Sequence, residues 1–451
     1  MRYEDFTLSV GERQPGGYAL AAMASGIGRA TAVLPLPPVA LTSALARTIA
    51  PTPAPPEVMR KAGTLLFDWA FPAPVRAHLR VAWDRAERAA MGLRIRLTID
   101  APEIAAWPWE LLHDPERDYT FATSPSTPLV RYFDQVDRFG SLAEQGAELP
   151  LELLLVLPAT PDLDLAQERR NVEQVAGATD DALRVHTLNG AVTRADLADA
   201  LLMGNYQIVH FGGHGGFIDG RGYLGLNEPS GAPEWIDGDA FARLVVNYRS
   251  IKLALLNACE SGQTDDGRAF MGLAPQLVRY GVPAVVAMQF AITDKAAATF
   301  AREFYKRLCA GDGAGQVDLA AAYARSMLSV LHPGDRSWAA PVLYTHAADG
   351  IIFVVPPRVR AGGALDPLAQ RERLAALTAS LQATLQTEDD WASADIATLM
   401  TWRRLTERAE QAYRTHLGHP RPEVRQAAQL GLELACQRLA ALDKALDALN
   451  D

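Results

Sequence analysis

Between residues 150 and 356, short apolar runs alternate with longer amphipathic stretches. The first run is apolar almost without interruption, which is typical of a strand buried on both faces of a parallel sheet. Strands are predicted over Leu151–Leu157, Leu183–Leu188, Tyr206–Phe211, Ile251–Asn257, Pro283–Met288 and Pro341–Thr345. Helices are predicted over Gln167–Ala176, Arg194–Leu202, Arg268–Tyr280 and Asp294–Leu308. This alternation predicts an α/β domain with a mostly parallel sheet flanked by helices.

Several of these helices carry sequence signals at their ends. Thr193 and Thr293 stand directly before two of them, where a hydroxyl can cap the first turn. Asp237 and Asp239 stand before a further helical stretch, and capping is a better account of them than catalysis. In the helix Gln167–Ala176, the Glu and Arg residues are expected on the polar side.

The pattern before residue 145 is mixed and predicts an N-terminal α+β region. Leu93–Ile99 alternates apolar and polar residues, as a half-buried strand does. Trp107 and Trp109 follow this strand and are expected to pack rather than to bind, because such rings bury large areas. The other strands predicted here are Asp5–Val10, Tyr18–Ala24 and Ala30–Leu34.

The last region, 366–451, has almost no strand formers and follows a linker at Ala364–Pro367. Leucines recur every three to five residues and predict a bundle of amphipathic helices. They are Leu374, Leu377, Leu381 and Leu385, then Leu430, Leu434, Leu439, Leu442 and Leu446. Two roles remain open for this C-terminal bundle: docking an activator, sensor or second subunit, or packing with no partner.

Length and composition agree with three regions. A chain of 451 residues should hold about three domains, and we place them at 1–145, 150–356 and 366–451. The net charge of -10 argues against a general binder of nucleic acid or of anionic membranes. No stretch reaches the roughly 20 uninterrupted apolar residues of a membrane span. The acidic residues near the start do not suit a signal peptide, so a cytoplasmic location is expected.

The cysteines bear on both compartment and chemistry. Cys259, Cys309 and Cys436 are too few and too scattered for a disulfide framework or a zinc cluster, and a reducing compartment suits them. Cys309 and Cys436 fall on predicted helices and are expected to pack. Cys259 follows a predicted strand directly, and this position makes it a candidate for chemistry.

His214 and Cys259 follow two predicted strands that could be neighbours, in loops that contain glycine. A histidine beside a cysteine is the minimum for thiol catalysis, since the imidazole generates the attacking thiolate. The backbone amides of Gly215 and Cys259 could form an oxyanion hole. The alternative is that Cys259 is a small buried apolar residue and His214 a satisfied polar one.

Two neighbours of the cysteine extend this candidate site. Glu260 either lines a substrate pocket or is a solvated loop acid. Asn257 lies two residues before Cys259 and would point the same way on a strand, so it is a candidate for supporting the site. Asp265 and Asp266 form an acidic loop. A charged surface loop is a simpler interpretation of it than a loop that gates the site.

Neither a cofactor nor a metal is expected. Gly220–Gly225 matches the spacing of a dinucleotide-binding loop, but Asn227, Pro229 and Gly231 prevent a helix after it. His210 and His214 have the spacing of a zinc pair, which brings ligands together only on a helix. His210 is instead expected inside the sheet.

The motifs around His214 and Cys259 resemble those of a known family. Ile208–Gly215 and Leu255–Gly262 look like the histidine and cysteine segments of the CHAT peptidases, relatives of caspases, legumain and separase. Later landmarks of the family resemble Gly281–Ala287, Phe304-Tyr305, Ala320–Ala324 and Trp338–Leu343. Leu93–Leu112 resembles a segment found upstream of CHAT domains. The resemblance covers about 150–350 and implies a caspase-like fold.

The resemblance also implies a function. His214 would be the general base and Cys259 the nucleophile of a cofactor-independent cysteine endopeptidase, a hydrolase that forms a thioester. It suggests a regulated bacterial protease that cleaves one or few protein partners in stress or anti-phage defence, with a gasdermin-like pore former among the candidate substrates. Two alternatives stay open: a non-catalytic scaffold with the same fold, and a thiol acyltransferase or esterase using the same dyad.

Overall fold

The computed structural model describes most of the chain. The described residues are 1–50, 54–134, 150–160, 163, 165–179, 182–218, 221–260, 272–290, 292–311, 313–355, 378, 399, 403, 406–407, 409–410, 413–414, 417 and 422–450. Two compact units are present, Met1–Val355 and Pro356–Asp451.

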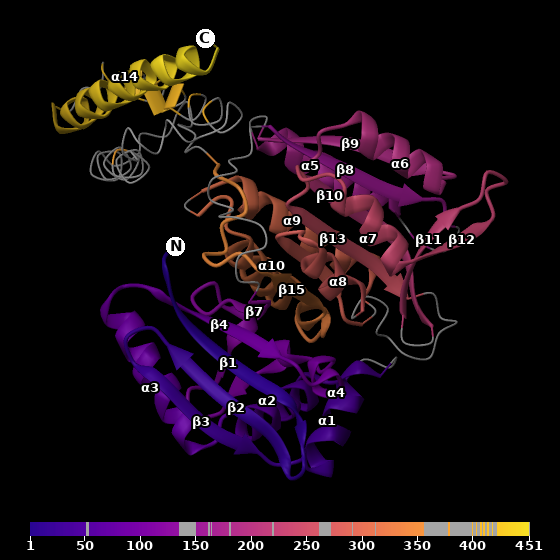
Figure 1. Ribbon diagram of the computed structural model, residues 1–451. Helices are drawn as coiled ribbons and strands as arrows, with labels where there is room; N and C mark the ends of the chain where they lie inside the picture. The colour runs from indigo at the N-terminus through magenta and orange to yellow at the C-terminus, as the bar shows by residue number, and fades with distance from the viewer. Residues whose placement is uncertain are drawn as a thin grey trace. The chain divides into compact units, whose positions relative to one another are not determined.

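One sheet of thirteen described strands runs through the first unit (Figure 1). Its order is β12 (Pro233–Asp237), β11 (Arg221–Asn227), β10 (Ile208–Ile218), β13 (Leu253–Glu260), β14 (Ala284–Met288), β15 (Pro341–Thr345), β7 (Leu129–Tyr132), β4 (Gly92–Ile99), β1 (Tyr3–Gln14), β2 (Gly17–Ala24) and β3 (Gly28–Leu34). The first half of β10 also pairs with β8 (Leu151–Pro158), which pairs with β9 (Leu183–Gly190).

The centre of this sheet is parallel, as the sequence predicts. Strands β9, β8, β10, β13 and β14 all run the same way, and β15 reverses direction. The pairing of β15 with β7, through Tyr344 and Arg131, joins the N-terminal strands to the later ones. The prediction of a mostly parallel sheet flanked by helices is therefore confirmed. The strands β1, β2, β3, β4 and β7 of the N-terminal α+β region belong to the same sheet.

Alternate residues of the central strands enter two different cores. Leu153, Leu155 and Leu255 lie in the core covered by α5 (Leu165–Ala178), α9 (Asp294–Cys309) and α10 (Val317–Leu331). Leu154 and Leu256 lie in the core covered by α6 (Arg194–Met203), α7 (Gly238–Val246) and α8 (Leu273–Tyr280). Burial on both faces explains why the β8 sequence is apolar except at Glu152.

The helix starts agree closely with the sequence signals. Thr193 forms a capping box with Asp196 at α6, and the Thr293 side chain accepts from the Ala296 amide at α9. Asp237 is the N-cap of α7, with its carboxylate 2.7 Å from the Ala240 nitrogen. Each cap satisfies a backbone donor that the first turn leaves without a partner.

Further helices cover the N-terminal strands. They are α1 (Val39–Ile49), α2 (Pro56–Ala70), α3 (Ala73–Arg88) and the short α4 (Pro102–Ala105). Trp109 is fully buried and donates from its indole nitrogen to the Ile104 carbonyl, as expected of a packing residue. The remaining elements are the short strands β5 (His113–Asp114) and β6 (Tyr119–Thr120) and the single turns Trp109–Leu111, Phe121–Thr123 and Ser337–Ala339.

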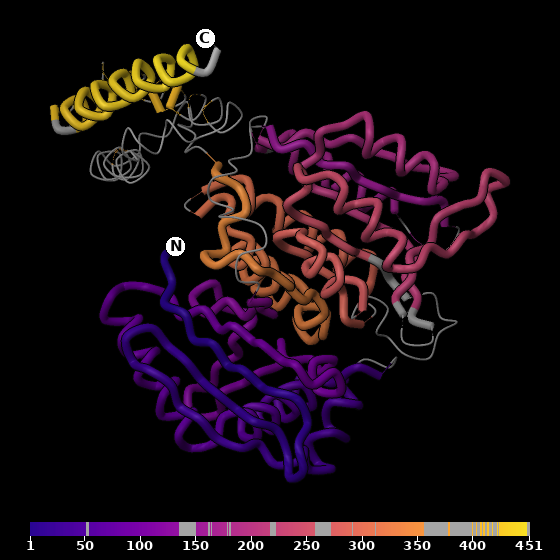
Figure 2. The backbone as a smooth tube through the Cα atoms, viewed as in Figure 1, coloured from indigo at the N-terminus to yellow at the C-terminus, as the bar shows by residue number. Residues whose placement is uncertain are grey.

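The second unit contains the long helix α14 (Pro422–Asn450), drawn in yellow in Figure 2. Its buried positions recur every three to four residues, as predicted, but they are mostly not leucines. Leu442 is buried, whereas Leu430 is 57% exposed, so the predicted leucine face is wrong there. The buried face consists of Val424, Ala428, Gly431, Ala435, Arg438 and Leu442.

Small residues on this face allow a close approach to another side chain. A Cβ added to Gly431 would lie 2.1 Å from the ring of Tyr413. Cys436 is exposed, so the expectation that it packs is wrong, whereas Cys309 at the end of α9 is buried as expected. Leu374, Leu377, Leu381 and Leu385 lie outside the described residues.

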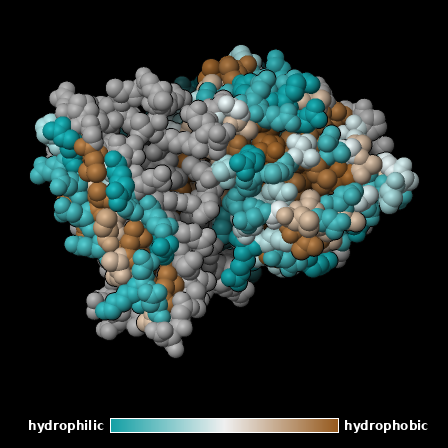
Figure 3. All heavy atoms as spheres, turned by 90° about the horizontal axis from the view of Figure 1, so that it is seen from above, coloured by the Kyte–Doolittle hydropathy of each residue, from teal (hydrophilic) through white to brown (hydrophobic). Residues whose placement is uncertain are grey.

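Hydrophilic residues cover most of the coloured surface in Figure 3, and apolar residues form separate small groups. Among the described helices, none is long and apolar enough to cross a membrane.

Candidate functional site

The two candidate catalytic residues occupy adjacent strands. β10 and β13 are parallel neighbours, and their register pairs His214 with Cys259 and Gly215 with Glu260. The predicted adjacency of these strands is confirmed. The side chains of Cys259 and Glu260, and both Asp265 and Asp266, lie outside the described part of the structure.

One expectation about this segment is wrong. The sequence predicts that the strand ends at Phe211 and that His214 lies in a loop, but β10 continues to Ile218. The glycine-rich stretch stays extended because it gains a second partner, β11, through pairs such as Gly215 with Leu224. His214 is therefore a residue of strand β10, which pairs with β13 on one side and with β11 on the other.

A buried polar cluster lies two residues further into the sheet. The Oε1 atom of Glu168 accepts a hydrogen bond from Asn257 Nδ2 and lies 2.7 Å from His210 Nε2. The other ring nitrogen, His210 Nδ1, lies 3.1 Å from the hydroxyl of Tyr305. His210, Asn257 and Glu168 are 0%, 2% and 5% exposed. We call these four residues the Glu168 cluster.

Hydrogen-bond chemistry gives a direction to the contact between His210 and Glu168. An ionised carboxylate only accepts hydrogen bonds, so His210 Nε2 donates to Glu168. The other ring nitrogen, Nδ1, faces the Tyr305 hydroxyl. Burial raises the pKa of Tyr305 well above its ordinary value, and the nearby charge of Glu168 raises it further. Tyr305 therefore keeps its hydroxyl proton.

Glu168 was expected on the polar side of its helix, and this expectation is wrong. Its carboxylate reaches over β10 at Gly212, where an added Cβ would lie 2.7 Å from Glu168 Oε2 and 2.8 Å from Leu157. Only glycine leaves room for the carboxylate at this point. Gly212 pairs in register with Asn257, so Glu168 covers the strand pair just before the positions of His214 and Cys259.

Asn257 has one polar atom left over. Its Nδ2 donates to Glu168, but its Oδ1 is buried and, within the described residues, receives no hydrogen bond. Position 257 shares a face of β13 with position 259, because successive residues of a strand alternate between faces. The sequence suggests that Asn257 supports the site, and Oδ1 is the atom that is placed to do so.

An exposed aromatic ring lies on the same face beside His214. Trp235 of β12 is 38% exposed, and an added Cβ on Gly216 would lie 3.3 Å from its ring. Gly225 lies between the two side chains, since its added Cβ would be 3.3 Å from His214 Cβ and 3.8 Å from the Trp235 ring. Across β10, β11 and β12, the row is therefore a histidine, a glycine and a tryptophan.

The family model of the CHAT domain matches residues 60–394. The chain belongs to the CHAT domain family. The match starts within α2, so it includes both β4 and the strands that carry His214 and Cys259. It extends further than the resemblance of the motifs alone, which begins near residue 150.

Two crystal structures of the Saccharomyces cerevisiae separase–securin complex are similar to this CHAT protein. The first match has 12% identity and a TM-score of 0.43, and covers 76% of this chain and 30% of the other. The second has 16% identity and a TM-score of 0.34, and covers 64% of this chain and 20% of the other. The chain thus spans less than a third of the length of each of these two chains. The family assignment rests on the CHAT match. No curated protein sequence matches the chain.

The described residues of the CHAT protein contain no cluster of three or more His, Cys, Asp or Glu side chains arranged to hold a metal. His210 and His214 both lie on β10. Four residues of strand span about 13 Å, which separates their rings too far to share an ion. As expected, His210 is buried inside the sheet. Sequence analysis gave no role at the site to three residues of this region: Glu168, Tyr305 and Trp235.

Proposed function

We propose that this CHAT protein is a cysteine endopeptidase with Cys259 as nucleophile and His214 as general base. The observation that carries the proposal is the register of β10 and β13, which pairs these two residues on adjacent parallel strands. A nucleophile and a base within reach of each other are what thiol catalysis requires. The CHAT match supports the same chemistry.

In this mechanism His214 takes the proton from the thiol of Cys259, and the thiolate attacks the scissile carbonyl carbon. The tetrahedral intermediate collapses to a thioester as His214 gives its proton to the leaving amine. Water, deprotonated by His214, then hydrolyses the thioester and restores the thiol. No cofactor takes part in these steps.

The amides of Gly215 and Cys259 are the proposed oxyanion donors. Gly215 is paired in register with Leu224 on one side and Glu260 on the other, so its amide points toward a neighbouring strand. Its oxyanion role therefore requires the strand ladder to be open at this position. Glu260 is proposed to line the substrate pocket.

We assign the Trp235 ring to the binding of a substrate side chain next to the scissile bond. The ring is exposed and lies one glycine away from His214. Aromatic rings supply a large contact area, so an apolar substrate residue suits this surface.

The biological setting is carried over from the family resemblance. We propose a cytoplasmic protease of bacterial immunity that cleaves a specific protein, a gasdermin-like or other co-encoded partner. The C-terminal bundle is the proposed docking site for an activator or sensor. Nucleic acid and membrane are not proposed as partners.

The test compares the wild type with Cys259→Ala and His214→Ala, using a fluorogenic peptide library and co-encoded neighbouring proteins as substrates. Cleavage by the wild type alone is expected. A Cys259→Ala protein that still cleaves the same substrate would overturn the assignment. A peptide electrophile should label Cys259; labelling only by acyl esters would instead indicate an acyltransferase or esterase, and no labelling would indicate a scaffold.

A further inference from the structure

The Glu168 cluster has a feature that a purely structural network lacks. A carboxylate can only accept hydrogen bonds, so Glu168 dictates the orientation of the Asn257 amide. The Nδ2 group must face Glu168, and the carbonyl oxygen Oδ1 must face away from it. A glutamine in place of Glu168 could donate as well as accept, and Asn257 would then be free to turn over.

Leaving the buried Asn257 Oδ1 atom without a hydrogen bond costs free energy. A buried acceptor that has lost water and gained no donor costs free energy, and native structures rarely keep one without a reason. Asn257 is 2% exposed, and no described residue donates to its Oδ1. An acceptor of this kind suits a donor whose positive charge arises only during the reaction, because the hydrogen bond then strengthens at that step.

The strand register indicates that His214 is the side chain next to Asn257 that could be this donor. Asn257 pairs with Gly212, and the next residues on the same face of each strand are His214 and Cys259. When His214 takes the thiol proton, both of its ring nitrogens carry hydrogen and the ring is positively charged. A neutral acceptor with a fixed carbonyl dipole stabilises that charge.

We propose that Glu168 is a positioning residue that acts through Asn257: it fixes Asn257 Oδ1 to accept a ring N–H of His214 when that imidazole holds the proton of Cys259. The S–H bond breaks, an N–H bond forms on His214, and Asn257 takes part only as a hydrogen-bond acceptor. This inference rests on the proposed function, since it assumes that His214 and Cys259 form the thiolate–imidazolium pair.

The chain offers a matched control in a second buried carboxylate, Glu110. It is fully buried, and it pairs with Arg131 and Gln289. Glu110→Gln disturbs a buried carboxylate of the same unit without touching β10 or β13. Any effect that comes only from weakened packing should therefore appear in both glutamine variants.

The first measurement is the rate at which iodoacetamide alkylates Cys259 at pH 7, in a Cys436→Ser background. Cys436 is exposed and would react, whereas Cys309 is buried. Only the thiolate reacts, so the rate reports how well the ion pair is stabilised. Glu168→Gln and Asn257→Ala should each slow alkylation about tenfold or more, the scale of one lost hydrogen bond to a charged group. Glu110→Gln should leave the rate within about twofold of wild type.

The second measurement separates kcat from KM on the substrate that the wild type cleaves. Glu168→Gln should lower kcat and leave KM unchanged, because the lost interaction is made to a charge present only during the reaction. If Glu168→Gln fails to fold, Asn257→Ala carries the same test. Equal slowing of alkylation by Glu168→Gln and Glu110→Gln, or none by Glu168→Gln, would overturn the inference. Alkylation needs no substrate, so wild-type alkylation that depends on His214, without any proteolysis, would contradict the proposed function alone.

Discussion

Two buried carboxylates of the same unit, Glu110 and Glu168, are held in opposite ways. Glu110 receives two hydrogen bonds from the Arg131 guanidinium, at 3.1 and 2.8 Å, and one from Gln289 at 2.8 Å. Glu168 receives its hydrogen bonds from His210 and Asn257. The first set contains a permanent cation and the second does not.

The difference separates a structural ion pair from a candidate site. Burial lowers the pKa of Arg131, but the charge of Glu110, the nearby Tyr344 and the hydrogen bonds to Glu110 together outweigh this effect and leave the pKa above its ordinary value. Arg131 also donates to the carbonyls of Ala105 and Trp107, so four of its hydrogen bonds are formed. The Glu168 cluster, in contrast, contains no arginine or lysine, and no described residue donates to Asn257 Oδ1. A complete network stabilises a fold, whereas an incomplete one keeps a group for another partner.

Breaking the complete network should give the largest effect on stability. Arg131→Met leaves the Glu110 charge buried without its cation, and such losses cost about 3–5 kcal/mol. Urea unfolding followed by circular dichroism measures this change in the free energy of unfolding. The alkylation rate of Cys259 should stay within about twofold of wild type in the folded variant.

The control for this prediction is the double variant Arg131→Met with Glu110→Gln. It removes the unpaired charge and should recover part of the lost stability, since neutral replacements of buried ion pairs are tolerated far better than half a pair. A loss below about 1 kcal/mol in Arg131→Met would mean that Glu110 is held mainly by Gln289, and the contrast with Glu168 would disappear.

The same contrast explains what sequence reasoning found and what it missed. The run Leu151–Leu157 and the caps at Thr193 and Asp237 were predictable because local pattern and short-range hydrogen bonds determine them. The pairing of His214 with Cys259 was predictable because consecutive parallel strands tend to be neighbours. These features need information from only one or two segments of the chain.

Glu168 was not predictable in this way. Its partners His210 and Asn257 lie 42 and 89 residues further along the chain. On its own helix a glutamate is ordinarily solvated, and only the tertiary fold buries it. The continuation of β10 past Phe211 has the same cause, because the glycines stay extended only where β11 supplies a second ladder.

A change on the site side of the comparison should alter function without altering stability. Trp235→Ala removes the exposed ring beside His214 and should raise KM about tenfold, equivalent to roughly 1.4 kcal/mol of lost binding. The alkylation rate should not change, because the ring is not part of the thiol chemistry. Trp235→Phe keeps an aromatic surface and should recover most of the affinity. An unchanged KM in Trp235→Ala would place the substrate elsewhere on the sheet.

A smaller effect is expected at the far end of the Glu168 cluster. Tyr305→Phe deletes the hydroxyl that lies 3.1 Å from His210 Nδ1, and one such hydrogen bond contributes about 1 kcal/mol of stability. Since Glu168 still receives its hydrogen bond from Asn257, the alkylation rate should fall by less than about threefold. A loss as large as that of Glu168→Gln would show that the cluster acts as one unit and not through Asn257 alone.

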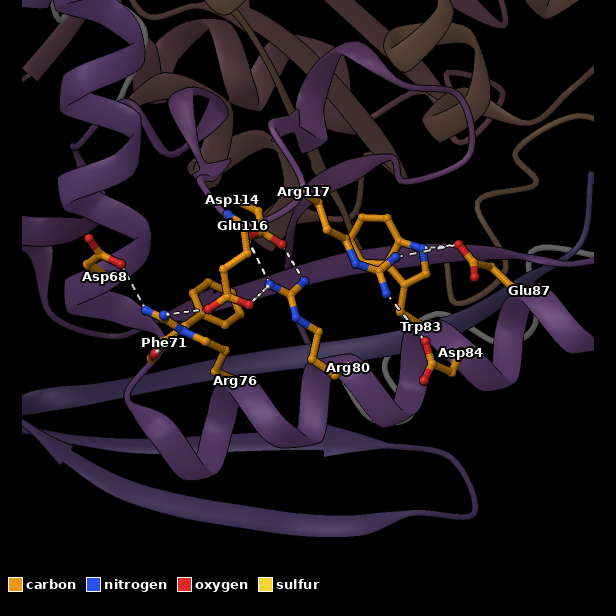
Figure 4. A network of polar contacts seen from close by, with 10 residues as sticks. All are labelled: Asp68, Phe71, Arg76, Arg80, Trp83, Asp84, Glu87, Asp114, Glu116 and Arg117. Carbon is orange, nitrogen blue, oxygen red and sulfur yellow. Dashed lines mark hydrogen bonds and ion pairs between the residues drawn. The ribbon is translucent and has the colours of Figure 1, made fainter.

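The smallest effect should come from a third polar network, on the surface of α3 (Figure 4). Arg117 stacks over the Trp83 ring at 4.4 Å and pairs with Asp84 at 3.3 Å, with about a third of its side chain exposed. Water and salt screen such pairs, so Arg117→Ala should cost no more than about 1 kcal/mol of unfolding free energy. Because the stacking does not depend on the carboxylate, Asp84→Asn should cost less still. An equal loss of unfolding free energy in Arg117→Ala and Arg131→Met would contradict this prediction. Burial would then not explain why the Arg131–Glu110 pair stabilises the protein more than a surface pair does.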